Sequence, residues 1–159
     1  MIVVGLSAVP YKPAALFLGT VLKNLYQAFG TVKEYENDKG VVLDFGVAKF
    51  RVRRAGGSNR RFLTTLASKM RPHRRALDAG TMDEALAENM HKEVYFETVV
   101  IGWEGVTDEA GVALEYNLAN FKKVMTDLPD LWLTLRLEAD NMKNFQLAEA
   151  EADGAKLGE

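Results

Sequence analysis

Apolar side chains recur every three or four residues in several stretches of the chain, which predicts helices with one buried face. The first stretch covers residues 14–29, and Gly30 then supplies a C-cap. The second runs from an N-capping Ser58 to Met70, where Pro72 breaks it. A short helical turn to Leu77 follows. The stripe positions are Leu18, Val21, Leu22, Leu25 and Phe29 in the first helix, and Phe62, Leu63, Leu66 and Met70 in the second.

Strict alternation of apolar and basic residues between Ala48 and Arg54 predicts a strand. Phe50 and Val52 belong to its apolar face, whereas Lys49, Arg51 and Arg53 form its basic face. A second apolar run, residues 41–45, precedes it by about two residues around Gly46, which predicts an antiparallel hairpin. A polar stretch ending in a turn at residues 38–40 leads into this hairpin.

The second half of the chain predicts further helices. Residues 81–84, Thr-Met-Asp-Glu, match a capping box, and large apolar residues then recur at four-residue intervals. No turn signal interrupts residues 95–103, so we expect this helix to continue into a buried segment despite its β-branched and aromatic residues. Asn117 caps the next helix, and Pro129-Asp130 ends it and caps the last one. The apolar stripe of this last predicted helix consists of Leu131, Leu135, Met142 and Phe145.

These elements predict a mainly helical α+β domain, in which an N-terminal helix and one antiparallel hairpin precede three to four packed helices. The 159 residues suit a single domain over residues 1–147, with residues 1–24 as a possible extension. Residues 148–159 lack large apolar groups beyond one leucine, which predicts a frayed or disordered tail.

Residue types argue against an enzyme. Cysteine is absent, which excludes disulfides and thiolate metal sites. His73 and His91 belong to no metal-ligand pattern, and we expect both to face solvent. The glycines form no phosphate-binding loop, and Asp108, Glu109 and Gly111 match only part of a calcium loop. We therefore expect no catalytic, metal or cofactor-binding residue and no cofactor. No apolar run approaches the ~20 residues of a membrane span, so we expect a cytoplasmic protein.

The net charge of −2 conceals a strong asymmetry along the chain. Ten of the 20 lysines and arginines lie between Asp44 and Asp78, where no acidic residue occurs, while acids dominate from Asp78 onward. The basic run, Lys49 to Arg75, could bind nucleic acid, but it shows no RNA-binding signature. The favoured alternatives are a solvated face or a surface that pairs with the acidic half, within one chain or between protomers.

One segment resembles a known family. Residues 100–120 read V-I-G-W-E-G-V-T-D-E-A-G-V-A-L-E-Y-N-L-A-N, and Leu128-Pro129-Asp130-Leu131 follows after a helix. This arrangement resembles the tail assembly chaperones of long-tailed bacteriophages, with similarity over roughly residues 25–145. The segment of residues 48–62 also resembles that family's strand-then-helix opening.

The resemblance implies that the protein binds the tape measure protein and keeps it soluble until tail tube subunits polymerise around it. The implied location is the cytoplasm of the infected host, with no copy in the mature virion. The expected partners are the tape measure protein, the major tail protein and further copies of this chain.

Helix-in-groove binding of such a client requires an apolar groove. Our hypothesis is that Met82, Leu86 and Met90, or part of the last helix, provide it, because methionine adapts to varied partners. Trp103 and Trp132 are either core residues or anchors for a partner. The basic face is expected to dock an acidic neighbour, through Arg51, Arg53 and Arg54.

Two alternatives remain open at this point. One is another phage morphogenesis factor, such as a minor tail component or connector. The other is a nucleic-acid-binding regulator that uses residues 49–75, which we regard as the weaker reading.

Overall fold

A computed structural model describes residues 24–146. The chain divides into two units, Met1–Gly30 and Thr31–Glu159. The described part of the first unit contains α1 (Leu25–Phe29). The Asn24 side chain accepts a hydrogen bond from the Gln27 N–H, and the N–H of Gly30 donates to Tyr26, so the predicted C-cap is confirmed. The rest of the predicted first helix, residues 14–23, lies outside the described residues, as does the predicted tail.

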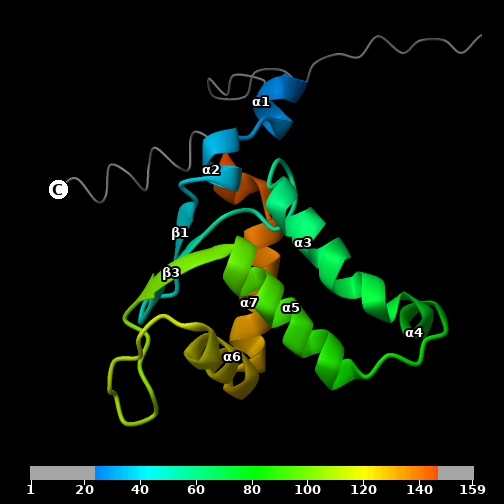
Figure 1. The fold of residues 1–159 in the computed structure, drawn as a ribbon. Coiled ribbons are helices and arrows are strands. Elements are labelled where there is room, and N and C mark those ends of the chain that lie inside the picture. The colour runs from blue at the N-terminus through cyan, green and yellow to red at the C-terminus, as the bar shows by residue number, and fades with distance from the viewer. Residues whose placement is uncertain (1–23, 147–159) are drawn as a thin grey trace, which may run out of the picture. The chain divides into compact units, whose positions relative to one another are not determined.

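The second unit contains a three-stranded antiparallel sheet in the order β1-β2-β3 (Figure 1). Its strands are β1 (Val41–Asp44), β2 (Lys49–Val52) and β3 (Val100–Glu104). The predicted hairpin is confirmed, with Leu43 opposite Phe50 and Asp44 opposite Lys49. The predicted alternation also holds, since Phe50 and Val52 are buried and Arg51 is exposed.

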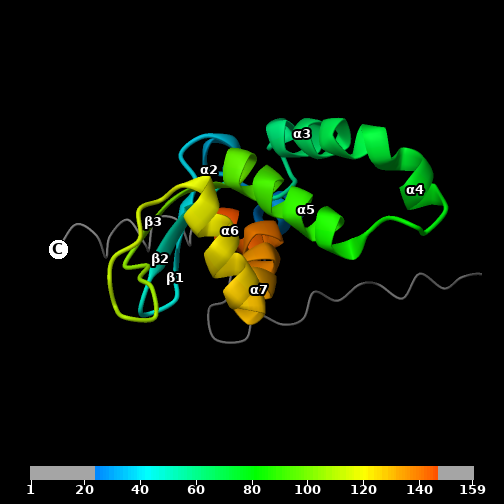
Figure 2. The same ribbon diagram turned by 60° about the horizontal axis from the view of Figure 1, so that its bottom comes forward.

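Helices account for most of the remaining described chain (Figures 1 and 2). They are α2 (Lys33–Asn37), α3 (Arg60–Met70), η1 (Arg71–His73), α4 (Arg74–Asp78), α5 (Glu84–Thr98), α6 (Leu118–Asp127), α7 (Pro129–Asp140) and η2 (Met142–Phe145). Helix α5 packs against both α3 and α6, and α6 packs against α7. The mainly helical α+β class predicted from the sequence is therefore confirmed.

A chain of aromatic rings connects the sheet to the helices. Phe50 on β2 meets Trp103 on β3 edge to face, with 6.0 Å between ring centroids. Trp103 stacks on Phe121 of α6 at 6.4 Å, and Phe121 meets Trp132 of α7 at 6.4 Å. Trp132 in turn contacts Tyr95 of α5 at 5.0 Å. Such edge-to-face contacts add to the stabilisation from burial, and this cluster anchors α5, α6 and α7 to one face of the sheet.

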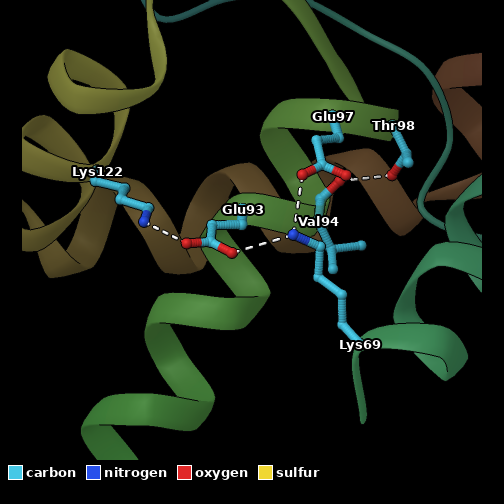
Figure 3. A network of polar contacts seen from close by, with 6 residues as sticks. All are labelled: Lys69, Glu93, Val94, Glu97, Thr98 and Lys122. Atoms are coloured by element: carbon cyan, nitrogen blue, oxygen red, sulfur yellow. Dashed lines mark hydrogen bonds and ion pairs between the residues drawn. The ribbon is translucent and has the colours of Figure 1, made fainter. Parts of the chain in front are cut away.

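A charge network ties three helices together on the surface of this core (Figure 3). Glu93 on α5 accepts from Lys69 of α3 at 3.1 Å and from Lys122 of α6 at 2.5 Å. Lys69 also donates to Glu97 at 2.9 Å. Because one carboxylate joins cations from two neighbouring helices, the network fixes α3 and α6 against α5.

The prediction of a continuous helix through residues 95–103 is wrong. Helix α5 ends at Thr98, whose hydroxyl donates to the carbonyl of Val94 at 2.6 Å, and the chain then forms β3. Both Val99 and Val100 are buried, and the strand pairs with β2 through an irregular register between Arg51 and Val52. Tertiary pairing with β2 thus overrides the absence of a turn residue.

Several predicted helix ends also differ. Asp83 caps α5 by accepting from the Leu86 N–H at 3.0 Å, so the predicted capping box of Thr81 and Glu84 is wrong. Asn59 rather than Ser58 is the N-cap residue of α3. Leu128 precedes α7, which makes Asp130 a first-turn residue instead of a cap. The last predicted helix is two elements, because Asn141 is extended between α7 and η2. The predicted cap of α6 by Asn117 is confirmed.

Candidate functional site

The predicted basic face is already engaged within the chain. On the outer side of β2, Arg51 donates to the carbonyl of Lys39 at 3.4 Å, and Arg53 donates to that of Asp38 at 2.9 Å. Arg54 forms an ion pair with Glu36 at 2.6 Å. The three arginines therefore hold the turn before β1 and helix α2, and Arg54 is compensated by an acid of its own chain.

Sequence reasoning missed Glu36, which is only 2% exposed. Burial alone would raise its pKa, but hydrogen bonds from Arg54, Thr31 and Ser58 outweigh it, so the pKa lies below the ordinary value. The polar stretch that contains Glu36 forms α2, a helix that the sequence pattern did not predict. Little in the sequence indicated that Glu36 is buried, because a single acid in a polar segment is usually exposed.

The predicted methionine groove is only partly present on the surface. Met82 lies before α5 and is half-buried, Leu86 is 39% exposed, and Met90 belongs to the buried set at 8%. The structure therefore leaves Leu86 as the exposed member of this trio.

Both tryptophans lie in the aromatic cluster. Trp132 is 3% exposed and its indole N–H donates to Glu88 at 2.8 Å. Trp103 is half-buried and donates to the carbonyl of Leu114 at 3.0 Å. The sequence left open whether the two tryptophans are core residues or anchors for a partner. Their contacts in the structure are those of core residues.

The prediction that His91 faces solvent is wrong. Its ring is half-buried, meeting Tyr95 at 5.1 Å and Trp132 at 5.5 Å between centroids. Burial lowers the pKa of His91, and the nearby Arg136 lowers it further against the opposing effect of Glu88. His73 is half-buried at the end of η1.

Helix α7 presents apolar residues on two opposite sides. Trp132, Leu135 and Ala139 face the core at 3%, 0% and 0% exposure. On the opposite side, Leu133 is 48% and Leu137 63% exposed, one helical turn apart. We call Leu133 and Leu137 the leucine face.

A second surface lies on the outer side of the sheet. A hollow of about 380 Å³ is lined by Val42, Ile101, Gly102 and Trp103, by the cations Lys49 and Arg51, and by the acid Glu104. A side chain at Gly102 would meet no neighbouring atom within 4 Å, so the hollow is open above it. Apolar side chains and cations thus occur together on this face.

Residues 24–146 offer no cluster of three His, Asp or Glu side chains arranged to hold a metal ion. Among the helices of the same residues, none combines the length and apolar character that crossing a membrane requires.

The chain belongs to a prophage protein family. The model of the YdaY prophage protein family matches residues 57–156, a stretch that begins at the glycine before α3 and includes α3 to η2. The protein is therefore of phage origin. No curated protein and no solved structure matches the chain.

Proposed function

We propose that the protein is a non-enzymatic tail assembly chaperone that binds the tape measure protein of its phage through the leucine face of α7. The observation that carries the proposal is the double-sided apolar character of α7. A surface helix normally turns charged or polar residues to solvent, whereas α7 turns Leu133 and Leu137 outward. Exposed apolar residues that are grouped rather than scattered are typical of protein-binding surfaces.

The setting of α7 supports a binding role. The carbonyl of Ala139 accepts from the Ala55 N–H at 2.9 Å, and Trp132 is tied to Glu88 of α5. The helix is thus held from the core side and presents its leucines from a rigid platform. Two leucines one turn apart are suited to packing against an apolar helix of a partner. The resemblance to tail assembly chaperones implies a tape measure protein as client, whose long helices would offer this contact.

Phage origin and the resemblance of residues 100–120 to tail assembly chaperones support the choice of the tape measure protein as client. On this proposal the protein acts in the cytoplasm of the host cell, is absent from the mature virion, and associates with the tape measure protein and the major tail protein. No step of this role requires a catalytic group.

Co-expression with the tape measure gene of the same prophage tests the proposal. We expect the wild-type chain to co-purify with the tape measure protein and to increase its soluble fraction. The double variant Leu133→Lys/Leu137→Lys should lose both effects, because two cations then occupy the apolar contact. The matched control is Leu63→Lys/Leu77→Lys, which alters two exposed leucines of α3 and α4.

Equal loss in both variants would show that the leucine face has no special role. If the wild-type chain does not co-purify with the tape measure protein, the chaperone proposal is refuted. Mass spectrometry of purified virions distinguishes a chaperone from a minor tail component or connector. A minor tail component or connector would be found in the virion, whereas a chaperone would be absent.

A further inference from the structure

Helix α3 continues through η1 into α4, and we call this segment, residues 60–78, the basic arm. Helix α5 lies along one side of α3, and no other element within residues 31–146 covers the opposite side (Figures 1 and 2). Phe62 is buried and Leu66 and Lys69 are half-buried on the α5 side. The exposed cationic and hydroxyl side chains recur with helical spacing, and they are Arg60, Arg61, Thr64, Ser68, Arg71, Arg74 and Arg75. Leu63 and Leu77 are also exposed on the arm, at 52% and 41%.

The cations of the central basic run differ in whether an acid of the same chain pairs with them. Arg54 is paired with Glu36, and Lys69 is paired with Glu93 and Glu97. Among the five arm arginines, within residues 24–146, only Arg74 has an acidic partner, Asp78, at 3.9 Å with both side chains largely exposed. Within residues 24–146, Arg60, Arg61, Arg71 and Arg75 of the arm therefore carry positive charge that no ion pair offsets.

We propose that the basic arm binds the phosphate backbone of double-stranded nucleic acid without sequence preference. Arginine presents a planar fork of donors that fits phosphate oxygens. From Arg60 to Arg71 the helix rises about 16 Å at ~1.5 Å per residue. At about 3.4 Å per phosphate along one strand, that length spans several phosphates. The hydroxyls of Thr64 and Ser68 lie between the cations and can donate to further phosphate oxygens.

The composition of the arm favours a duplex over two other partners. A protein partner generally contacts an interface whose centre is apolar and rich in aromatic residues. The exposed positions between Arg60 and Arg71 are instead cationic, hydroxylated or small, with Leu63 as the apolar exception. Single strands are held by bases stacked on aromatic side chains. The aromatic residue of α3, Phe62, is buried against Tyr95 instead.

Fluorescence anisotropy of the full chain with a labelled 20-base-pair DNA duplex tests the proposal. We expect binding at 50 mM salt that weakens steeply at 200 mM. The variant Arg71→Gln/Arg75→Gln should weaken binding at least tenfold and reduce the slope of log affinity against log salt by about 2, since each phosphate contact contributes ~0.9. The matched control Lys33→Gln/Lys143→Gln removes the same charge from exposed positions outside the arm and should change affinity less than twofold.

Three outcomes would overturn the proposal: no binding at 50 mM salt, equal losses in both double variants, or tighter binding of a single strand of equal length. If the duplex does not bind but the arm variant alters sedimentation at low salt, the arm serves association between copies. Thermal unfolding followed by circular dichroism verifies that each variant is folded. Duplex binding should persist in Leu133→Lys/Leu137→Lys, so failure of this proposal and failure of the chaperone proposal are distinguishable.

Discussion

Gly57 lies beside the carboxylate of Glu36, in the loop between β2 and α3. Its φ of +53° belongs to the left-handed region that side chains with a Cβ rarely adopt. A Cβ at this position would lie 2.3 Å from Glu36 Oε2 and 2.8 Å from a guanidinium nitrogen of Arg54. The glycine therefore makes room for the buried ion pair as well as for the turn.

Gly57→Ala should lower the free energy of unfolding by about 2–3 kcal/mol, of which roughly 1 kcal/mol comes from the backbone conformation and the rest from displacement of the ion pair. Gly80→Ala is the matched control, because its φ is +66° and no atom lies within 4 Å of an added Cβ. Urea unfolding measures both variants. If Gly57→Ala and Gly80→Ala lower the free energy of unfolding equally, contact with Glu36 contributes nothing to the effect.

At the scale of elements, Glu93 connects α5 to its two neighbouring helices. The hydrogen bond from Lys122 lowers the pKa of Glu93, burial opposes this, and Lys69 lowers it further. Because the folded-state pKa lies below the ordinary carboxyl value of 4.5, the stabilisation is present above that value. It is lost as pH falls through the lowered pKa, where the folded state also takes up the proton.

We expect Glu93→Gln to lower the free energy of unfolding by about 1 kcal/mol at pH 7, a modest value because the side chain is partly exposed. The difference from wild type should vanish as pH falls below the ordinary carboxyl range. Asp127→Asn is the control, since it removes an exposed pair with Lys123 on a single helix, and we expect no resolvable change. Urea midpoints at pH 7 and at successively lower pH provide the measurement.

Prediction from sequence succeeded for elements whose pattern is local. The alternation around Phe50 and the cap at Asn117 depend on neighbours within one element, and both are confirmed. Prediction failed where residues distant in the sequence determine the structure of a segment. Strand β3 forms because Arg51 and Phe50 pair with it, and the burial of Glu36 depends on Arg54, 18 residues away. For the same reason, the sequence could not distinguish Arg54, which an acid compensates, from the arginines of the basic arm.

At the scale of the whole molecule, the buried core belongs to the second unit. Every buried apolar residue of the core cluster lies between Val41 and Phe145. The segment before this span is joined to its end, because the Val32 N–H donates to the carbonyl of Phe145 at 2.8 Å. The segment from Thr31 onward therefore contains both the core and the contact that closes it.

A chain of residues 31–159 should consequently fold by itself and unfold in one cooperative transition, since burial of apolar surface is the dominant stabilising term. We expect its urea midpoint to match that of the full chain within the error of the measurement, and its proton spectrum to keep the shifted ring-current signals of residues around Trp132. A broad transition or loss of those signals would show that residues 1–30 contribute to the core. The same fragment retains the basic arm and the leucine face, so it also allows the two binding proposals to be tested without the first unit.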